Sequence, residues 1–395
     1  MLNIIDNVTP EILIPHELLT FCEMTKSERE FTAKAVAFAK PKKILEVGVS
    51  AGGSTVVLLE AIKSMPETRI CSIDVRERWW QNSEMPVGWM VNVMYPNGNS
   101  QLQLHTGKDP SELLPSMNEK FDFLLLDTAH IHPAETLNFL TVLPYLTEDA
   151  FVVLHDIGLF SRTNSEISNA SKLLFDTVTA EKCELFNYEY QLSEHSNDSV
   201  IHFPNIAAFR LNADTRKYIR DVFSMLRFSW GMMPMRLSNI YAVLESNYDE
   251  ECMFMFKTSV AVNLSYLYCA RSYNFSSIGN IFCFLLDNYV KILFKFKEYS
   301  RIVQHGAGKF GVYFLGLVNG LGFRPPDLIW DKNYDQIKEV DGMAVTPPDY
   351  SILNESDLVI IAVADVTSAH SLLANRFYCP CKNIYTFKEF CSNFS

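Results

Sequence analysis

The stretch ILEVGVSAGGST, residues 44–55, decides the fold. Its apolar run ends at Glu46, and a turn with three glycines follows. The next residues, STVVLLEAIKSM at 54–65, have the apolar content of a buried helix. A buried strand, a glycine turn and a helix in this order indicate an α/β unit in which a ligand can approach the backbone of the turn.

The same alternation continues on both sides of this stretch. Continuous apolar runs predict buried strands, and runs with helical spacing predict helices between them. The predicted strands lie at 42–48, 69–75, 102–107, 121–127 and 150–156, with a hairpin of two more at 184–190 and 206–211. The predicted helices lie at 26–39, 54–65, 111–117 and 132–146. Such alternation predicts an α/β fold with a mostly parallel sheet covered on both faces, followed by an antiparallel hairpin.

The pattern changes twice along the chain, which predicts three parts. Residues 1–212 form the first α/β domain. Residues 213–299, rich in Phe, Met, Tyr and Leu, form a helical connector or dimerisation segment. Residues 300–395 resume the alternation and form a second, smaller Rossmann-like domain. A homodimer is the default expectation.

Composition limits the partners. The 34 basic and 46 acidic residues give a net charge of −12, which argues against a nucleic-acid partner. The most apolar part, residues 258–286, is interrupted by Arg271, so neither half reaches the roughly 18 uncharged residues of a membrane span. Nine scattered cysteines and no signal peptide in MLNIIDNVTPEIL predict a cytoplasmic protein with free thiols.

Acidic residues end four of the predicted strands. They are Glu46, Asp74, Asp127 and Asp156. In an open α/β sheet, ligands bind outside the carboxyl ends of the strands. Because crowded carboxylates repel one another, four of them at one sheet edge predict a ligand or a cation between them.

The glycine turn lacks the G-x-G-x-x-G spacing of a dinucleotide site. It resembles the E/D-x-G-x-x-x-G loop of the class I S-adenosylmethionine-dependent methyltransferases. The resemblance implies that the loop and the helix start after it hold the methionine part of the cofactor, with the acid accepting from its ammonium group. The residues concerned are Glu46, Gly48, Ser50, Gly52, Gly53 and Ser54. An ordinary Rossmann-like domain with a capping serine is the alternative.

Two more residues are assigned to the cofactor. Asp74 stands where this family holds both ribose hydroxyls, and a carboxylate with two acceptor oxygens suits a vicinal diol. Asp109, in the turn after the third strand, stands where adenine contacts arise.

The catalytic end is LLLDTAHIHPAE followed by VVLHDIG. It resembles the metal-dependent O-methyltransferase branch, including sugar O-methyltransferases related to cephalosporin-hydroxylase-like proteins. The resemblance implies Asp127 and Asp156 as ligands of Mg²⁺ and His130 as general base. A cation stabilises the developing alkoxide while a neutral imidazole removes the proton. A helix-capping role is the alternative for His130, and His132 is expected at the helix entry.

Two departures from that branch leave the metal open. Ile157 stands where catechol-type enzymes have an Asn ligand, and His155 stands where some sugar-acting relatives have Glu. His is a poorer ligand of Mg²⁺ than a carboxylate. His155 is therefore a metal ligand or a supporting residue, or the site holds no metal.

A second motif, VQHGAGKFG, follows a strand near the carboxyl end. Gly306, Gly308 and Gly311 satisfy G-x-G-x-x-G, and Asp331 lies about twenty residues further on, as in a dinucleotide site. Only about three strands remain, fewer than two mononucleotide halves need. The stretch is similar to the Rossmann-like carboxyl-terminal unit of sugar C-methyltransferases, which implies either a contact with a nucleotide-linked sugar or a purely architectural role.

These observations predict a methyltransferase that uses S-adenosylmethionine to O-methylate a sugar or another small hydroxylated acceptor, in polysaccharide or natural-product biosynthesis. Three alternatives stay open. They are a C- or N-methyltransferase on a nucleotide-linked sugar, an NAD-binding oxidoreductase or sensor that uses Gly306–Gly311, and a catalytically silent interaction module. The tryptophan-rich stretch at 79–89 either walls the acceptor pocket or packs in the core.

Overall fold

A computed structural model describes most residues of the chain. They are 11–159, 169–185, 189–192, 199–202, 205–232, 234–269, 295–320, 322–363, 365–386 and 389–390. The chain separates into two compact units, residues 1–225 and 226–395. The predicted division at residues 212 and 299 stays a prediction.

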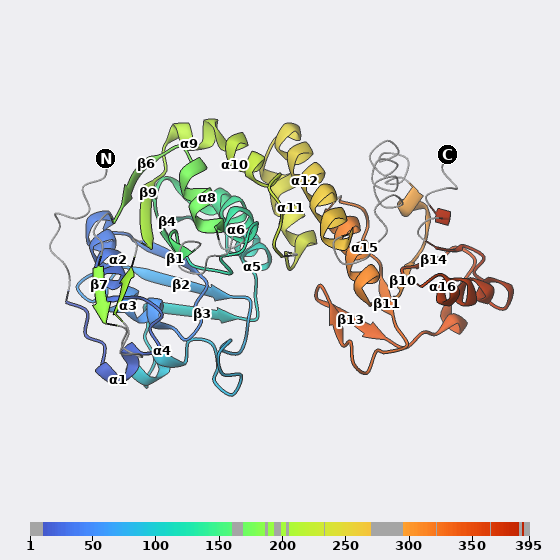
Figure 1. Cartoon of the computed structure of the whole chain (residues 1–395), viewed down its shortest axis with the longest axis horizontal. Helices are drawn as coiled ribbons and strands as arrows, with labels where there is room; N and C mark the ends of the chain where they lie inside the picture. Colours follow the sequence, from blue (N-terminus) through green and yellow to red (C-terminus); the bar gives the residue numbers. More distant parts are fainter. Residues whose placement is uncertain are drawn as a thin grey trace. The chain divides into compact units, whose positions relative to one another are not determined.

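The first unit is built on a seven-stranded sheet with the order β3-β2-β1-β4-β5-β9-β6 (Figure 1). The strands are β1 Lys43–Val47, β2 Arg69–Asp74, β3 Leu102–Thr106, β4 Phe121–Leu126, β5 Leu146–His155, β6 Glu181–Glu184 and β9 Ile206–Arg210. The first five pair in parallel, and β9 is antiparallel to both β5 and β6. The predicted α/β class, a parallel sheet ending in an antiparallel pair, is confirmed.

Helices cover this sheet from two sides (Figure 1). The helices are α1 His16–Leu19, α2 Lys26–Ala39, α3 Gly53–Ala61, α4 Trp89–Met94, α5 Pro110–Met117, α6 Ala134–Val142, α8 Ala170–Thr177, α9 Ala213–Lys217 and α10 Ile219–Met225. One group contains α2, α3 and α4, and the other contains α5, α6, α8 and α10. A capping box between Thr25 and Glu28 begins α2.

The structure differs from the sequence prediction near residue 185. The strand expected at 184–190 lies earlier, as β6, and two short strands, β7 Glu189–Leu192 and β8 Ser199–His202, pair in a separate sheet. The helix expected at 132–146 ends at Val142, because Pro144 has no N–H to continue it, and a 3₁₀ turn follows at Leu143–Tyr145. Helix α8 was not predicted.

Gly48 lets the ends of β1 and β4 approach each other. Its φ is +91°, and a Cβ atom placed on it would lie 1.7 Å from the carbonyl oxygen of Asp127. Gly53 has a similar steric role, since its Cβ would lie 2.5 Å from the Cα and carbonyl oxygen of Cys22. The glycines of this loop are therefore required by backbone packing, whatever ligand the loop also binds.

The second unit begins with helices α11 Leu237–Asn247 and α12 Glu250–Cys269, which pack against α15 Lys309–Gly320. Its sheet has the order β12-β13-β11-β10-β14-β15. The strands are β10 Ile302–His305, β11 Leu328–Trp330, β12 Glu339–Val340, β13 Met343–Thr346, β14 Leu358–Ile361 and β15 Ile384–Thr386, and α16 Val366–Leu373 precedes the last of them.

Five strands of this second sheet run in parallel, and four of them follow the glycine turn, where about three were expected. The strand that the sequence analysis missed is β13. It is only four residues long and forms a short antiparallel hairpin with β12. The parallel strands have the doubly wound order 3-2-1-4-5, and the point where the order reverses lies between β10 and β14.

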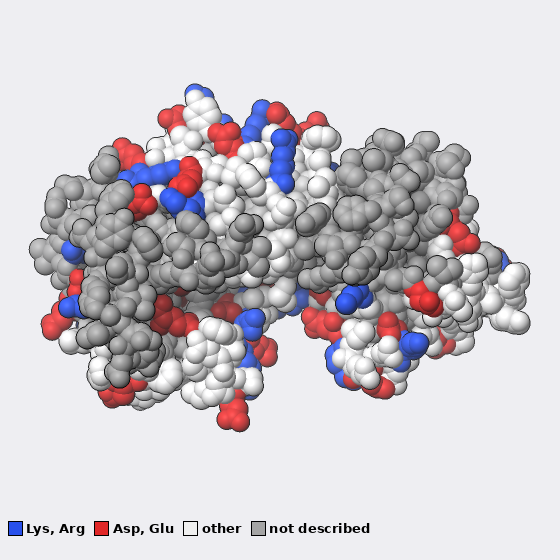
Figure 2. Space-filling view, viewed as in Figure 1, with Lys and Arg blue, Asp and Glu red and all other residues white. Residues whose placement is uncertain are grey.

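The surface carries both signs of charge. In Figure 2, Lys and Arg side chains alternate with Asp and Glu over the visible described atoms. Among the described residues, no helix combines the length and the apolar character that crossing a membrane requires. Residues 270–286 of the apolar stretch lie outside the described residues.

We expect Gly48→Ala to lower the free energy of unfolding by roughly 3 kcal/mol or more, because it adds both a left-handed backbone penalty and a clash with the backbone of β4. Urea titration followed by circular dichroism measures this. Gly98→Ala is the matched control, since Gly98 also has a positive φ (+78°) but no atom within 4 Å of its added Cβ. That control should lose only about 1 kcal/mol. An equal loss of unfolding free energy in both variants would show that the close approach of Gly48 to the end of β4 does not require a glycine.

Candidate active site

Asp74 holds the glycine loop in place. One carboxylate oxygen, Oδ2, accepts hydrogen bonds from the backbone N–H groups of Val49 and Ser50, both at 3.0 Å. The other, Oδ1, accepts from the N–H of Arg76 at 2.8 Å. Each oxygen has two lone pairs, so Oδ2 is fully used and Oδ1 retains one lone pair for a ligand hydroxyl at the loop. The predicted contact of Asp74 with the ribose stays a prediction.

Glu46 lies one layer deeper than the other strand-end acids. It pairs with Ser72 in the sheet, two residues before Asp74, so the expected alignment of four acids at one level is wrong. Its side chain is fully buried. The carboxylate accepts from the hydroxyls of Ser54 at 2.6 Å, Thr55 at 2.7 Å and Ser72 at 2.5 Å. In this structure the Glu46 side chain fixes α3 to the sheet.

Burial changes the acidity of Glu46. Loss of water raises the pKa of its carboxyl group from 4.5 to about 7, and the hydroxyls of Ser54, Ser72 and Thr55 offset part of that rise. The folded protein therefore holds a proton on this group at pH values where the unfolded chain has lost it.

The remaining loop residues shape the start of α3. Gly52, with a φ of +98°, is the N-cap of the helix, and Gly53 and Ser54 are its first two residues. The first turn of a helix presents N–H groups without intrahelical acceptors and the positive end of the helix dipole. Ser50 also has a left-handed backbone, with a φ of +53°. A ligand carboxylate at this helix start would meet complementary charge.

Asp109 is used by its own helix. It is the N-cap of α5, accepting from the N–H of Ser111 at 2.9 Å, and Glu112 completes a capping box. Its predicted contact with adenine stays a prediction, and its capping bonds explain its position without a ligand.

Asp127, His130 and Asp156 converge where β4 and β5 end. The Nε2 atom of His130 lies 3.0 Å from Oδ2 of Asp156 and 3.6 Å from Oδ1 of Asp127. All three side chains are partly exposed, so a ligand can reach them. One ligand atom from each lies within 4.8 Å of the others, and among the described residues this is the group that could hold a metal ion.

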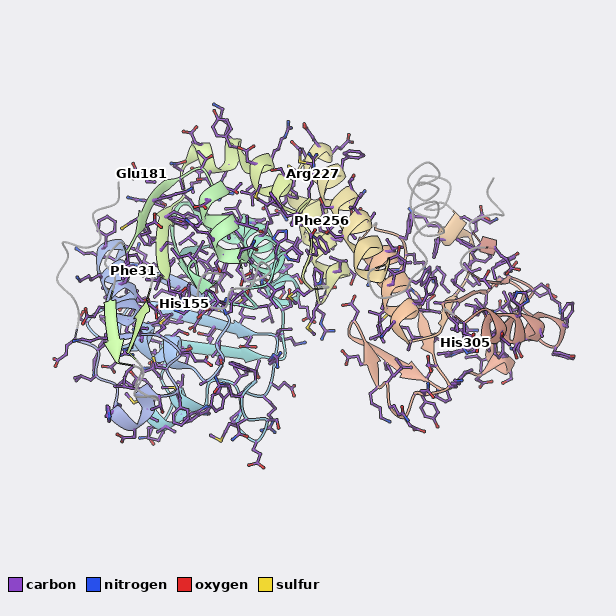
Figure 3. All side chains as sticks on the ribbon, in the orientation of Figure 1. Phe31, His155, Glu181, Arg227, Phe256 and His305 are labelled. Carbon is purple, nitrogen blue, oxygen red and sulfur yellow. The ribbon has the colours of Figure 1, made fainter. Side chains whose placement is uncertain are left out.

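His155 lies beneath this cluster in the first unit, where Figure 3 labels it. It is 4% exposed. Its Nδ1 is 3.3 Å from Oδ1 of Asp127 and 3.4 Å from Oδ2 of Asp156, and its Nε2 is 3.4 Å from Oε2 of Glu28 on α2. The structure therefore places His155 as a buried support that contacts both predicted metal-binding aspartates.

Sequence reasoning missed three polar residues that hold the cluster. Glu135, fully buried on α6, accepts from the backbone N–H of His130 at 2.7 Å and from the hydroxyl of Thr128 at 3.0 Å. Its Oε1 is also 3.5 Å from Nδ1 of His130. An acid in the first turn of a helix that follows a candidate catalytic loop is the signal that could have identified it.

The other two missed residues are Asn205 and Glu28. Asn205 precedes β9, and its side chain donates to Oδ1 of Asp156 at 2.5 Å and accepts from the N–H of Gly158 at 2.9 Å. The sequence shows only an asparagine before a strand. Glu28 is recognisable as a capping residue, but its contact with His155 depends on tertiary structure.

The imidazoles and carboxylates of the cluster alter one another. Burial by itself lowers the pKa of His130, but the carboxylates of Asp156, Asp127 and Glu135 raise it above its ordinary value. The pKa of His155 is raised well above its ordinary value, because Asp127, Asp156 and Glu28 outweigh its burial. Burial opposes ionisation of Asp156, yet the two imidazoles lower its pKa well below the usual range.

The predicted tryptophans divide between two environments. Trp79 and Trp89 are buried and pack on Phe21, with ring centroids 5.9 and 5.1 Å away. Trp80 is 60% exposed, and its indole N–H donates to Glu23 at 3.1 Å. Burial raises the pKa of Glu23, a hydrogen bond with Ser50 lowers it, and the charge of Asp127 raises it, so Glu23 and the indole it holds lie beside the glycine loop.

The second predicted site lies in the other unit. Gly306 follows β10 with a φ of +124°, and Gly308 and Gly311 lie at the start of α15. Asp331 follows β11 and accepts from the N–H of Ala307 at 2.7 Å. The four residues predicted for this site thus meet at one turn.

Comparison with known proteins bears on the first unit. Residues 45–157 match the family model described as a methyltransferase domain. This stretch runs from the glycine loop to the residue after Asp156 and includes each predicted cofactor and cluster residue of the first site.

Residues 45–157 thus resemble a methyltransferase domain. The predicted resemblance to S-adenosylmethionine-dependent methyltransferases is confirmed for this part of the chain. Among curated proteins, none matches the sequence.

Similar solved structures overlap about half of the chain. They include the O-methyltransferase TomG from Streptomyces achromogenes in complex with SAM, 14% identical over 51% of this chain and 92% of that chain, with a TM-score of 0.37. An O-methyltransferase from Bacillus cereus in complex with SAH is 16% identical over 50% and 93%, with a TM-score of 0.36. A precorrin-6y C5,15-methyltransferase from Geobacter metallireducens is 14% identical over 51% and 95%, with a TM-score of 0.33.

We expect the stability of the first unit to fall as pH rises through the window from 4.5 to about 7, because the folded state keeps the Glu46 proton that the unfolded chain releases. Glu46→Gln should remove a component on the order of 3 kcal/mol from the difference in unfolding free energy between pH 5 and pH 7.5. Urea unfolding at both pH values measures it. The exposed Glu84→Gln is the control, and an identical pH dependence in both variants would contradict the buried proton.

Proposed function

We propose that the first unit binds S-adenosylmethionine across the glycine loop and transfers its methyl group to a hydroxyl oxygen of a small acceptor. The observation that carries this proposal is the position of the Asp127–His130–Asp156 cluster. Asp74 is the last residue of β2 and the cluster lies after β4 and β5, with the glycine loop after β1 between them. A ligand lying over this loop reaches an acid at one end and a base with two carboxylates at the other.

The cofactor contacts follow from the loop. Asp74 offers the remaining lone pair of Oδ1 to a ribose hydroxyl, and the first turn of α3 offers N–H groups to the methionine carboxylate. Because Glu46 is enclosed by three hydroxyls, we assign it the role of holding α3, in place of a direct bond to the ammonium group. A second carboxylate, that of Glu23, also lies beside this loop, where it interacts with Ser50.

His130 is proposed as the general base. The acceptor oxygen attacks the methyl carbon of the sulfonium, the carbon–sulfur bond breaks, and the hydroxyl proton moves to Nε2 of the neutral His130 imidazole, which is the form present above its raised pKa. The products are the methyl ether and a neutral thioether. Glu135 beside Nδ1 and Asp156 beside Nε2 stabilise the resulting imidazolium. Positioning of the two reactants supplies much of the remaining rate.

A divalent cation is the other arrangement that this cluster could support. Asp127, Asp156 and His130 would hold it, and it would lower the pKa of the acceptor hydroxyl. Two oxygens and one nitrogen suit Mn²⁺ better than Mg²⁺, which prefers oxygen. Since Nε2 of His130 cannot bind a cation and accept a proton together, the two arrangements exclude each other.

A sugar or similar polyol is the proposed acceptor class. Its support is the exposed indole face of Trp80, which Glu23 fixes beside the loop, because indole rings stack well on sugar rings. The nine cysteines, scattered along the sequence without a regular framework, support the proposed cytoplasmic setting. The homodimer stays a prediction.

We expect Asp74→Ala to abolish binding of S-adenosylmethionine, because it removes both the proposed ribose acceptor and two hydrogen bonds that shape the loop. Isothermal titration calorimetry with S-adenosylhomocysteine measures it. Asp331→Ala is the matched control, since Asp331 occupies the equivalent position in the second sheet. An unchanged affinity in Asp74→Ala, or an equal loss in the control, would remove the assignment of the cofactor site.

We expect His130→Gln to lower kcat by about 10²- to 10⁴-fold without changing cofactor affinity, as for the loss of a general base. The assay is release of S-adenosylhomocysteine from EDTA-treated protein with a panel of sugars, polyols and catechols. His132→Gln is the control, because His132 is buried away from the cluster carboxylates.

The same assay separates the alternatives. Loss of activity in EDTA with recovery in Mn²⁺ would show that the cluster binds a cation and that His130 is not the general base. Activity that survives both EDTA and Asp156→Asn would contradict O-methylation by this cluster and favour a C- or N-methyltransferase.

A further inference from the structure

The glycine turn of the second unit repeats the backbone contacts of the first. The N–H of Gly306 donates to the carbonyl of Trp330 in the neighbouring strand, at 2.7 Å. A Cβ on Gly306 would lie 2.3 Å from the carbonyl oxygen of Ala362, at the end of β14, just as one on Gly48 would meet that of Asp127. Both turns therefore lie where two parallel strands end side by side and the strand order reverses.

The acids beside the two turns also correspond. Oδ2 of Asp331 accepts from the N–H of Ala307 in the turn, and Oδ1 accepts from the N–H of Asn333 at 2.8 Å. Asp74 bonds its own loop through Oδ2 and the N–H two residues further on, that of Arg76, through Oδ1. The second sheet thus presents a carboxylate to a ligand diol in the same manner as the first.

The residue beneath the second turn differs in charge. Gln304 stands two residues before Gly306, as Glu46 stands two residues before Gly48. It is fully buried, and its Nε2 donates to the carbonyls of Gly306 at 2.8 Å and Gly311 at 3.0 Å.

The side-chain amide oxygen of Gln304 accepts no hydrogen bond from the described residues. Oε1 of Gln304 has no hydrogen-bond partner in the part of the chain that the structure describes, whereas three hydroxyls satisfy Glu46. A buried acceptor without a donor is costly, so this oxygen at the turn indicates a donor that a bound molecule supplies.

The outer side of the turn is open and basic. A Cβ on Gly308 would meet no atom within 4 Å, and Gly308 and Lys309 are exposed. Helix α15, 12 residues long, begins at Lys309 and presents its positive dipole end there. With a neutral amide in place of Glu46 and a lysine at the helix start, this turn favours an anion, where the first favours an amino-acid zwitterion.

We propose that the turn at residues 306–311 binds a nucleoside diphosphate, with Asp331 on the ribose hydroxyls and the start of α15 on the diphosphate. This group occurs both in nucleotide-linked sugars and in dinucleotides such as NAD⁺. The site consists of residues of the second unit, and its assignment does not depend on the function proposed for the first unit.

Calorimetric titration of the full chain with ADP, UDP, NAD⁺ and inorganic pyrophosphate tests the proposal. We expect saturable binding of ADP or UDP and at least tenfold weaker binding in Gly308→Glu, which places a carboxylate at the phosphate position. Because a side chain at Gly308 meets open space, this variant should keep the wild-type melting temperature and its affinity for S-adenosylhomocysteine. The exposed Tyr378→Glu adds the same charge elsewhere on the unit and should bind like the wild type.

The outcomes are distinct. Binding of NAD⁺ at least tenfold tighter than ADP identifies a dinucleotide, and tighter binding of UDP identifies a nucleotide-linked sugar. Absence of binding to the wild type, equal binding in Gly308→Glu, or a loss in Asp74→Ala alone would overturn the proposal, the last by placing the nucleotide in the first unit.

Discussion

Two hydrogen bonds from the loop N–H groups of Val49 and Ser50 to a single oxygen of Asp74 are the constraint on which the site depends. They fix the turn after β1 against the end of β2, while Gly48 allows the same turn to touch the end of β4. The loop is thereby held between two strand ends before any ligand arrives. A site preorganised in this way does not need to spend binding energy on ordering its backbone.

The sequence was sufficient for the sheet and for the acids at its edge. The positions of Asp127 and Asp156 could be predicted from the local sequence, because each residue directly follows an apolar run that forms a strand. His130 was likewise visible from its spacing after Asp127. The sequence did not predict how deeply each acid is buried. Glu46 lies in the interior, because the register of β1 with β2 places it opposite Ser72 and not opposite Asp74.

The missed residues share one property, which is that their function depends on long-range contacts. Glu28, Glu135 and Asn205 reach the cluster from α2, from α6 and from the residue before β9. Two of them have an adequate local explanation as first-turn acids of helices. In the second unit, strand β13 escaped notice because four residues next to a hairpin carry little periodic signal.

The place of β9 in the sheet has a consequence for the order in which the protein becomes competent. This strand lies between β5 and β6, and Asn205 at its entry holds the carboxylate of Asp156, 49 residues earlier. A nascent chain that has left the ribosome only as far as residue 160 contains each proposed reactive group, yet lacks the strand that steadies them. Competence therefore waits until about half of the chain has been made, when residues 205–210 pair with β5.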